Sequence, residues 1–178
     1  FINSYNSMYN YMFDGGEHHW THKDSFVPRI LIWNGAFNII SENLVNGVGL
    51  SNFNNALLIQ ISSQKINAVK PGYKDHSAGI NHAHNQYLDI FAKTGILGFI
   101  ILISLLSLFY YYFRKYKESE NFDLSYSAII GCLLIIMFSS NMLFHAILSH
   151  QQSTLFMVVI LFIFAGMTAN NSFTEDRR

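Results

Sequence analysis

The chain has 178 residues, of which 51% are hydrophobic and only 12% are charged, and its formal net charge is zero. Low charge combined with 16 Phe and 10 Tyr residues is typical of a membrane protein rather than of an ordinary soluble domain. A chain with no net positive charge has no global field to attract nucleic acid, so nucleic-acid binding is excluded.

Residues 1–93 contain most of the charges that lie outside a later connector and the C-terminal tail, and they are predicted to form a large helical loop outside the membrane. The first residue is Phe1 and no signal-peptide pattern follows, so we expect a piece of a longer protein. Pro28 suits a first helical turn and predicts a helix from about that residue. Its apolar face is expected to carry Ile30, Trp33, Phe37 and Ile40.

A glycine-rich loop and a second helix are predicted next. Gly47 and Gly49 lie within residues 46–53, where two glycines permit positive φ and close backbone approach. Residues 54–69 then predict a moderately amphipathic helix, with Leu57, Leu58, Ile61, Ala68 and Val69 on one side. From Asn85 onward the pattern again favours a helix, which would place His84, Tyr87, Leu88 and Phe91 on one face.

Three membrane-spanning helices are predicted in residues 94–178. Residues 94–113 are uncharged and long enough to cross a hydrocarbon core of about 30 Å. Residues 124–174 contain no Asp, Glu, Lys or Arg, and their polar dip at 145–153 divides them into two spans, about 126–144 and 154–171. The predicted fold is therefore all-α: a polytopic membrane protein with a large external loop followed by three spans.

The basic residues predict the orientation of these spans. Arg114, Lys115 and Lys117 follow the first span, and Arg177 and Arg178 end the chain. The positive-inside rule places both clusters in the cytoplasm, and residues 1–93 outside it.

His84 and Arg29 are the main candidates for chemistry. Neutral histidine accepts protons near neutral pH, whereas a solvated or helix-capping histidine is the alternative. Arg29 suits a phosphate clamp, although a snorkelling surface arginine is the alternative. The histidines of Glu17–His22 and His82–His84 match no strong zinc signature, so no metal or other cofactor is expected. His145 and His150 are predicted to face the same side of the membrane as His84.

These residues in order resemble the O-antigen ligase and polymerase family. Arg29 and Trp33 are similar to its arginine-led external helix, Gly47-Val48-Gly49 to its following glycine motif, and His84-Asn85 to its His-Asn motif. Gly95 and Gly98 follow at the family's spacing, and the resemblance spans about Arg29 to Asn171.

The resemblance implies an integral membrane glycosyltransferase of the bacterial inner membrane, with residues 1–93 in the periplasm. It implies that His84 is the base that deprotonates the acceptor and that Arg29 contacts the pyrophosphate of an undecaprenyl-pyrophosphate-linked glycan donor. A further family arginine is expected upstream of Phe1. The acceptor would be lipid A core or another glycan, which leaves ligase and repeat-unit polymerase open; a non-enzymatic membrane transport subunit is the rival. The residues expected to bind substrate are Trp33, Gly47, Gly49, His82, Asn85 and Tyr87.

Overall fold

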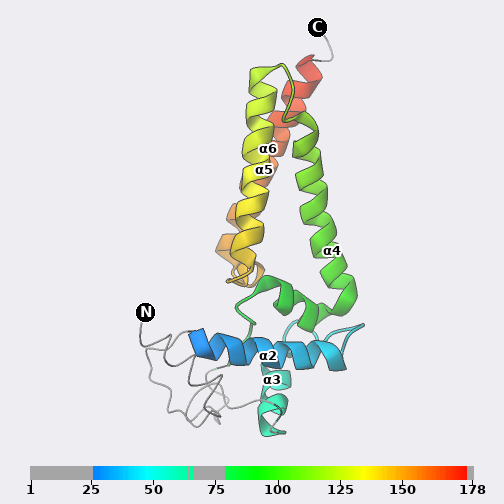
Figure 1. The fold of residues 1–178 in the computed structure, drawn as a ribbon, viewed down its shortest axis with the longest axis vertical. Coiled ribbons are helices and arrows are strands. Elements are labelled where there is room, and N and C mark those ends of the chain that lie inside the picture. Colours follow the sequence, from blue (N-terminus) through cyan, green and yellow to red (C-terminus); the bar gives the residue numbers. More distant parts are fainter. Residues whose placement is uncertain (1–25, 64, 66–78, 176–178) are drawn as a thin grey trace. The chain divides into compact units, whose positions relative to one another are not determined.

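The computed structural model describes residues 26–63, 65 and 79–175, and every regular element in these ranges is a helix. This confirms the predicted all-α fold for the described part of the chain. The chain divides into two compact units, Phe1–Leu97 and Gly98–Arg178. The elements, labelled in Figure 1, are α2 (Phe26–Glu42), α3 (Phe53–Ser62), α4 (Gln86–Tyr116), α5 (Phe122–Met142), the 3-10 turn η1 (Ile147–Ser149) and α6 (Gln151–Glu175).

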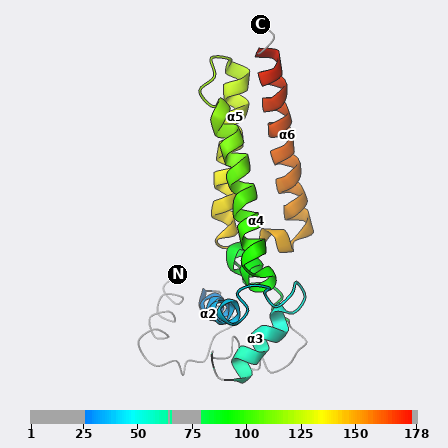
Figure 2. The same cartoon turned by 90° about the vertical axis from the view of Figure 1, so that its right-hand side faces the viewer.

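In the first unit, α3 runs across α2, which Figure 2 shows end-on. Helix α2 begins at Phe26, two residues before Pro28, so the predicted start is confirmed to within two residues. The predicted apolar face is wrong in part, because Phe37 is 58% exposed. Ile40 of the predicted face is buried, but the core lies mostly on a neighbouring face of α2, together with residues of α3, of α4 and of the turn before α4: Leu31, Ile32, Ala36, Ile39, Ile40, Phe53, Leu57, Ala83 and Ala92.

Helix α3 ends at Ser62, earlier than the predicted end at residue 69. The hydroxyl groups of Ser62 and Ser63 both donate hydrogen bonds to the carbonyl oxygen of Ile59. Such local side-chain bonds compete with the continuing helical ladder, which explains a helix end at this pair. The last residues of the predicted helix, 66–69, lie outside the described residues.

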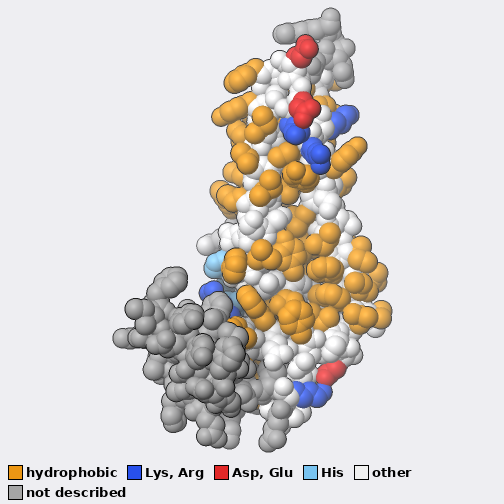
Figure 3. Space-filling view, viewed as in Figure 1, with side chains coloured by type: hydrophobic (Ala, Val, Ile, Leu, Met, Phe, Trp, Pro, Cys, Tyr) orange, Lys and Arg blue, Asp and Glu red, His pale blue; other side chains and the backbone are white. Residues whose placement is uncertain are grey.

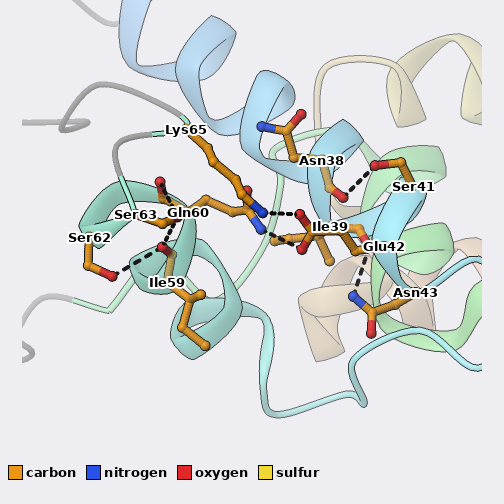
Figure 4. Close-up of polar contacts among 10 residues, drawn as sticks. All are labelled: Asn38, Ile39, Ser41, Glu42, Asn43, Ile59, Gln60, Ser62, Ser63 and Lys65. Carbon is orange, nitrogen blue, oxygen red and sulfur yellow. Dashed lines mark hydrogen bonds and ion pairs between the residues drawn. The ribbon is translucent and has the colours of Figure 1, made fainter.

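A carboxylate at the end of α2 joins this helix to the end of α3. The side chain of Glu42 accepts hydrogen bonds from Nε2 of Gln60, at 2.8 Å, and from Nζ of Lys65 (Figure 4). Both donors lower the pKa of Glu42 below its usual value of 4.5. Gln60 is buried, whereas the Glu42–Lys65 ion pair is at the surface.

The second unit contains α5, α6 and most of α4, the helices expected to span the membrane. The stretches Gln86–Tyr116, Phe122–Met142 and Gln151–Phe173 are each long and apolar enough to cross a bilayer. Within the unit, α5 and α6 lie side by side, and the connector between α4 and α5 lies at the same end as the C-terminal end of α6 (Figures 1 and 2). The protein is therefore a membrane protein, while the boundary between external and membrane regions at residue 93 stays a prediction.

Two of the buried contacts between these helices involve a glycine or a pair of hydroxyl groups. Gly131 of α5 lies against the ring of Phe113 of α4, so closely that a Cβ atom would be within 2.3 Å of the ring. Thr168 of α6 donates a hydrogen bond of 3.1 Å to Ser127 of α5, and both residues are fully buried. Small residues and interhelical hydrogen bonds commonly stabilise the association of helices in lipid.

The surface of the second unit is apolar along the helices and charged at one end. Figure 3 shows hydrophobic side chains over much of it. Many large apolar residues of α4, α5 and α6 are exposed, such as Leu108, Leu133 and Phe162. Arg114, in the last turn of α4, and Lys117, in the connector after it, are both exposed. The cytoplasmic placement of this end stays a prediction.

Candidate functional site

The His-Asn motif forms the turn that starts α4, rather than the first turn of the helix itself. Helix α4 begins at Gln86, and His84 has a φ of +53°, in the left-handed region. The prediction that His84 shares a helical face with Tyr87 is therefore wrong. The side-chain oxygen of Asn85 accepts the backbone N–H groups of Tyr87 and Leu88 at 3.0 and 3.1 Å. Asn85 thus caps the helix, because first-turn N–H groups have no partner within the helix.

Ala83 fixes this turn through both of its backbone groups. Its N–H donates to Oδ1 of Asp89 at 2.9 Å, and its carbonyl accepts a hydrogen bond of 2.9 Å from Nε1 of Trp33. The side chain of Ala83 is fully buried. On either side of it, the rings of His82 and His84 meet edge to face with their centroids 4.3 Å apart. We call the two hydrogen bonds of the Ala83 backbone, to Asp89 and from Trp33, the Ala83 clamp.

A buried ion pair supports the clamp. The second carboxylate oxygen of Asp89 lies 2.8 Å from Nζ of Lys93, one turn further along α4, and the two side chains are only 2% and 8% exposed. The Lys93 ammonium group also lies 5.7 Å from the centre of the Phe53 ring, at the start of α3. This pair is not among the predicted site residues, although its i,i+4 spacing is a visible signal in the sequence.

Arg29 lies on the same helix as Trp33, the residue that bonds to this turn. The two residues are four positions apart on α2, so they lie one above the other on the same helical face. Arg29 is partly buried, and Trp33 bonds directly to the residue beside His84. The first unit thus combines the helix that carries a permanent cation with the turn that carries a histidine pair. An arginine can bind an anionic group and a neutral histidine can accept a proton; that Arg29 and His84 do so together stays a prediction.

The predicted glycine loop docks against the backbone of α4. The N–H of Val48 donates to the carbonyl of Ala92 at 2.9 Å, and the N–H of Gly49 donates to that of Lys93 at 2.8 Å. Gly47 and Gly49 have φ values of +63° and +91°. The N–H of Gly47 donates to the carbonyl oxygen of Asn43, just after α2, at 2.9 Å. Both glycine N–H groups therefore have hydrogen-bond partners within the protein, and substrate binding by the two glycines stays a prediction.

Gly95 provides the other half of this backbone contact. It interrupts the helical conformation of α4 with φ 68° and ψ −165°. A Cβ atom at Gly95 would lie 2.1 Å from the carbonyl oxygen of Val45, and one at Gly47 would lie 2.4 Å from the carbonyl carbon of Lys93. Just after the break, the N–H of Ile96 donates to Leu44 at 2.9 Å. The spacing of Gly95 after His84-Asn85 matched the family pattern, but nothing in the sequence predicted that Gly95 interrupts α4.

The remaining candidate histidines lie elsewhere or outside the described residues. His145 and His150 line a cleft of about 500 Å³ in the second unit, together with Asn141 and Phe156. The histidines of Glu17–His22 lie outside the described residues. Within the described residues, no three His, Cys, Asp or Glu side chains gather as a metal site.

The sequence profile of the family described as O-antigen ligase matches residues 1–103 of the chain, more than half of its length. The chain belongs to the O-antigen ligase family. The matched region contains α2, α3, the glycine loop, the His-Asn turn and the first part of α4. It begins earlier and ends earlier than the expected range of Arg29 to Asn171.

A curated relative is longer than this chain. The chain is 24% identical over 132 residues to a protein of Haemophilus influenzae (strain ATCC 51907 / DSM 11121 / KW20 / Rd) described as uncharacterized. The aligned region is 74% of this chain but only 31% of that relative. The chain therefore spans about a third of the length of the curated relative that it matches.

Proposed function

We propose that the chain is part of a membrane glycosyltransferase of the bacterial inner membrane. It would transfer a glycan from a polyprenyl pyrophosphate donor to an acceptor on the periplasmic side. Membership of the O-antigen ligase family supports a glycan-related reaction, and the three apolar helices support a lipid-linked substrate. The contact that carries the proposal is the hydrogen bond from Trp33 to Ala83, which links the Arg29 helix to the His84 turn.

The proposed chemistry uses charge and proton transfer alone. Arg29 binds the donor pyrophosphate, and its fixed positive charge stabilises the negative charge that develops on this leaving group. His84 removes the proton from the acceptor hydroxyl as the oxygen attacks the sugar carbon. The bond from the sugar to the pyrophosphate oxygen breaks, a new glycosidic bond forms, and polyprenyl pyrophosphate leaves. The proton stays on His84 until solvent removes it.

The central test is His84→Asn in the full-length parent protein. Asparagine tolerates positive φ, so this variant keeps the turn while removing the imidazole. We expect release of polyprenyl pyrophosphate by purified protein to fall by about 10² to 10⁴-fold, with donor binding retained. A transfer rate close to that of the parent protein would refute the role of His84.

Arg29→Lys tests the second role. Lysine keeps the charge but loses the planar fork, so we expect a raised KM for the donor with a smaller change in turnover. Arg29→Ala should be worse than Arg29→Lys in the same assay. Donor KM and turnover unchanged in both variants would contradict pyrophosphate binding by Arg29.

The acceptor distinguishes the ligase from the polymerase. Surface glycan from a strain that lacks the parent protein should be separated by gel electrophoresis. Loss of a polymerase leaves single repeat units attached, whereas loss of a ligase leaves none. The family match fits both outcomes, since each reaction uses the same kind of donor.

A further inference from the structure

We infer that Asp89, paired with Lys93, is a positioning residue that holds His84 in its catalytic orientation; this rests on the proposed function. Asp89 belongs to none of the motifs that point to the family. Its side chain is 98% buried; one carboxylate oxygen accepts the Ala83 N–H at 2.9 Å, and the other pairs with the Lys93 ammonium at 2.8 Å.

The conformation of His84 explains why such a support is needed. A non-glycine residue at φ +53° is in a sparsely populated region, and it stays there only when its surroundings determine the backbone on both sides. On the C-terminal side, Asn85 caps α4. On the N-terminal side, the Ala83 clamp holds the preceding peptide.

An aspartate suits this position better than a neutral acceptor. A charged acceptor makes a stronger hydrogen bond, particularly away from water. Lys93 compensates the buried charge and is itself held, since its carbonyl accepts the N–H of Gly49 and its ammonium lies near the Phe53 ring. Through this chain of contacts, the His84 turn is tied to the glycine loop and to the start of α3.

The test compares two double variants of the full-length parent protein in its membrane. Both replace Lys93 with methionine, so neither leaves a buried charge without a partner. D89N/K93M keeps a carbonyl oxygen for the Ala83 N–H, whereas D89L/K93M has a side chain of similar size without one. We expect D89N/K93M to keep turnover within a few-fold of the parent. We expect D89L/K93M to lose on the order of 10²-fold in turnover at unchanged donor KM, as misplaced catalytic groups do.

Equal turnover in the two variants, whether both high or both low, would overturn the inference, and so would a loss that appears in donor KM alone. If D89L/K93M does not accumulate in the membrane, D89A/K93M replaces it, because it removes the same acceptor of the Ala83 N–H with a smaller side chain. Its turnover should also be well below that of D89N/K93M, and equal turnover would overturn the inference. His84→Asn in the same assay separates the two proposals. If His84→Asn is inactive while D89L/K93M is active, only the positioning role fails.

Discussion

Replacing Gly95 with alanine should undock the glycine loop from α4. The new Cβ atom would lie 2.1 Å from the carbonyl oxygen of Val45 and 2.4 Å from its carbonyl carbon, and neither is a flexible side-chain end. The backbone of Gly95, at φ 68° and ψ −165°, is also in a region that only glycine adopts readily. The loop and the helix break therefore have to separate.

The expected cost follows from the contacts that would be lost. An alanine at position 95 costs about 1–3 kcal/mol, whether it keeps the glycine-only conformation or forces the backbone out of it. Three backbone hydrogen bonds join the loop to α4, from Val48, Gly49 and Ile96, and each contributes about 1 kcal/mol. The sum is a destabilisation of roughly 4–6 kcal/mol for Gly95→Ala.

Thermal unfolding of the full-length protein in mild detergent, followed by tryptophan fluorescence, measures this effect. Gly166→Ala is the matched control, because Gly166 of α6 is exposed and its new Cβ would meet nothing within 4 Å. We expect the midpoint temperature to fall clearly for Gly95→Ala and to change little for Gly166→Ala. Equal midpoints for these two variants would refute the reasoning.

A double-mutant cycle tests the same contact from its other side. A Cβ atom at Gly47 would lie 2.6 Å from the backbone nitrogen of Gly95, so both substitutions break one interface. The combined loss in Gly47→Ala with Gly95→Ala should be well below the sum of the single losses. Simple additivity would show that the two glycines act at independent sites.

Three further predictions concern other contacts. The pKa of Glu42 is lowered in the folded protein, so its stabilising contribution is present above pH 4.5 and is lost as the pH falls below that value. Glu42→Gln should therefore flatten the dependence of the unfolding midpoint on acid pH. An unchanged dependence in this variant would contradict the prediction. Gly131→Ala should destabilise the second unit by about 1–3 kcal/mol because its Cβ enters the ring of Phe113, with a smaller loss when Phe113→Leu is added; equal losses would contradict the contact. Thr168→Val should cost about 1 kcal/mol by losing the hydrogen bond to Ser127, which SDS unfolding measures; the same loss in a Ser127→Ala background would contradict coupling.

The sequence alone determined the features that depend on neighbouring residues. Uncharged apolar runs predicted three helices that could span a membrane, and the structure contains three such helices. Pro28 predicted the start of α2, and two close glycines predicted the loop after it. The order of short motifs, from Arg29 to Gly98, indicated the O-antigen ligase family. The signals for the helices and the loop each lie within a few residues of the feature that they predict.

Only the tertiary structure decided how the candidate site is held. Trp33 and Ala83 are 50 positions apart, and no periodicity in the sequence predicts that their hydrogen bond forms. Beside this contact, His84 has a left-handed backbone conformation before the start of α4, although the local sequence pattern favours a helix there. Gly95 has a helix-like sequence context, yet it breaks α4 where the backbone of the glycine loop makes contact. Local patterns set helices and loops, whereas the conformation of a turn or a break depends on the distant groups that pack against it.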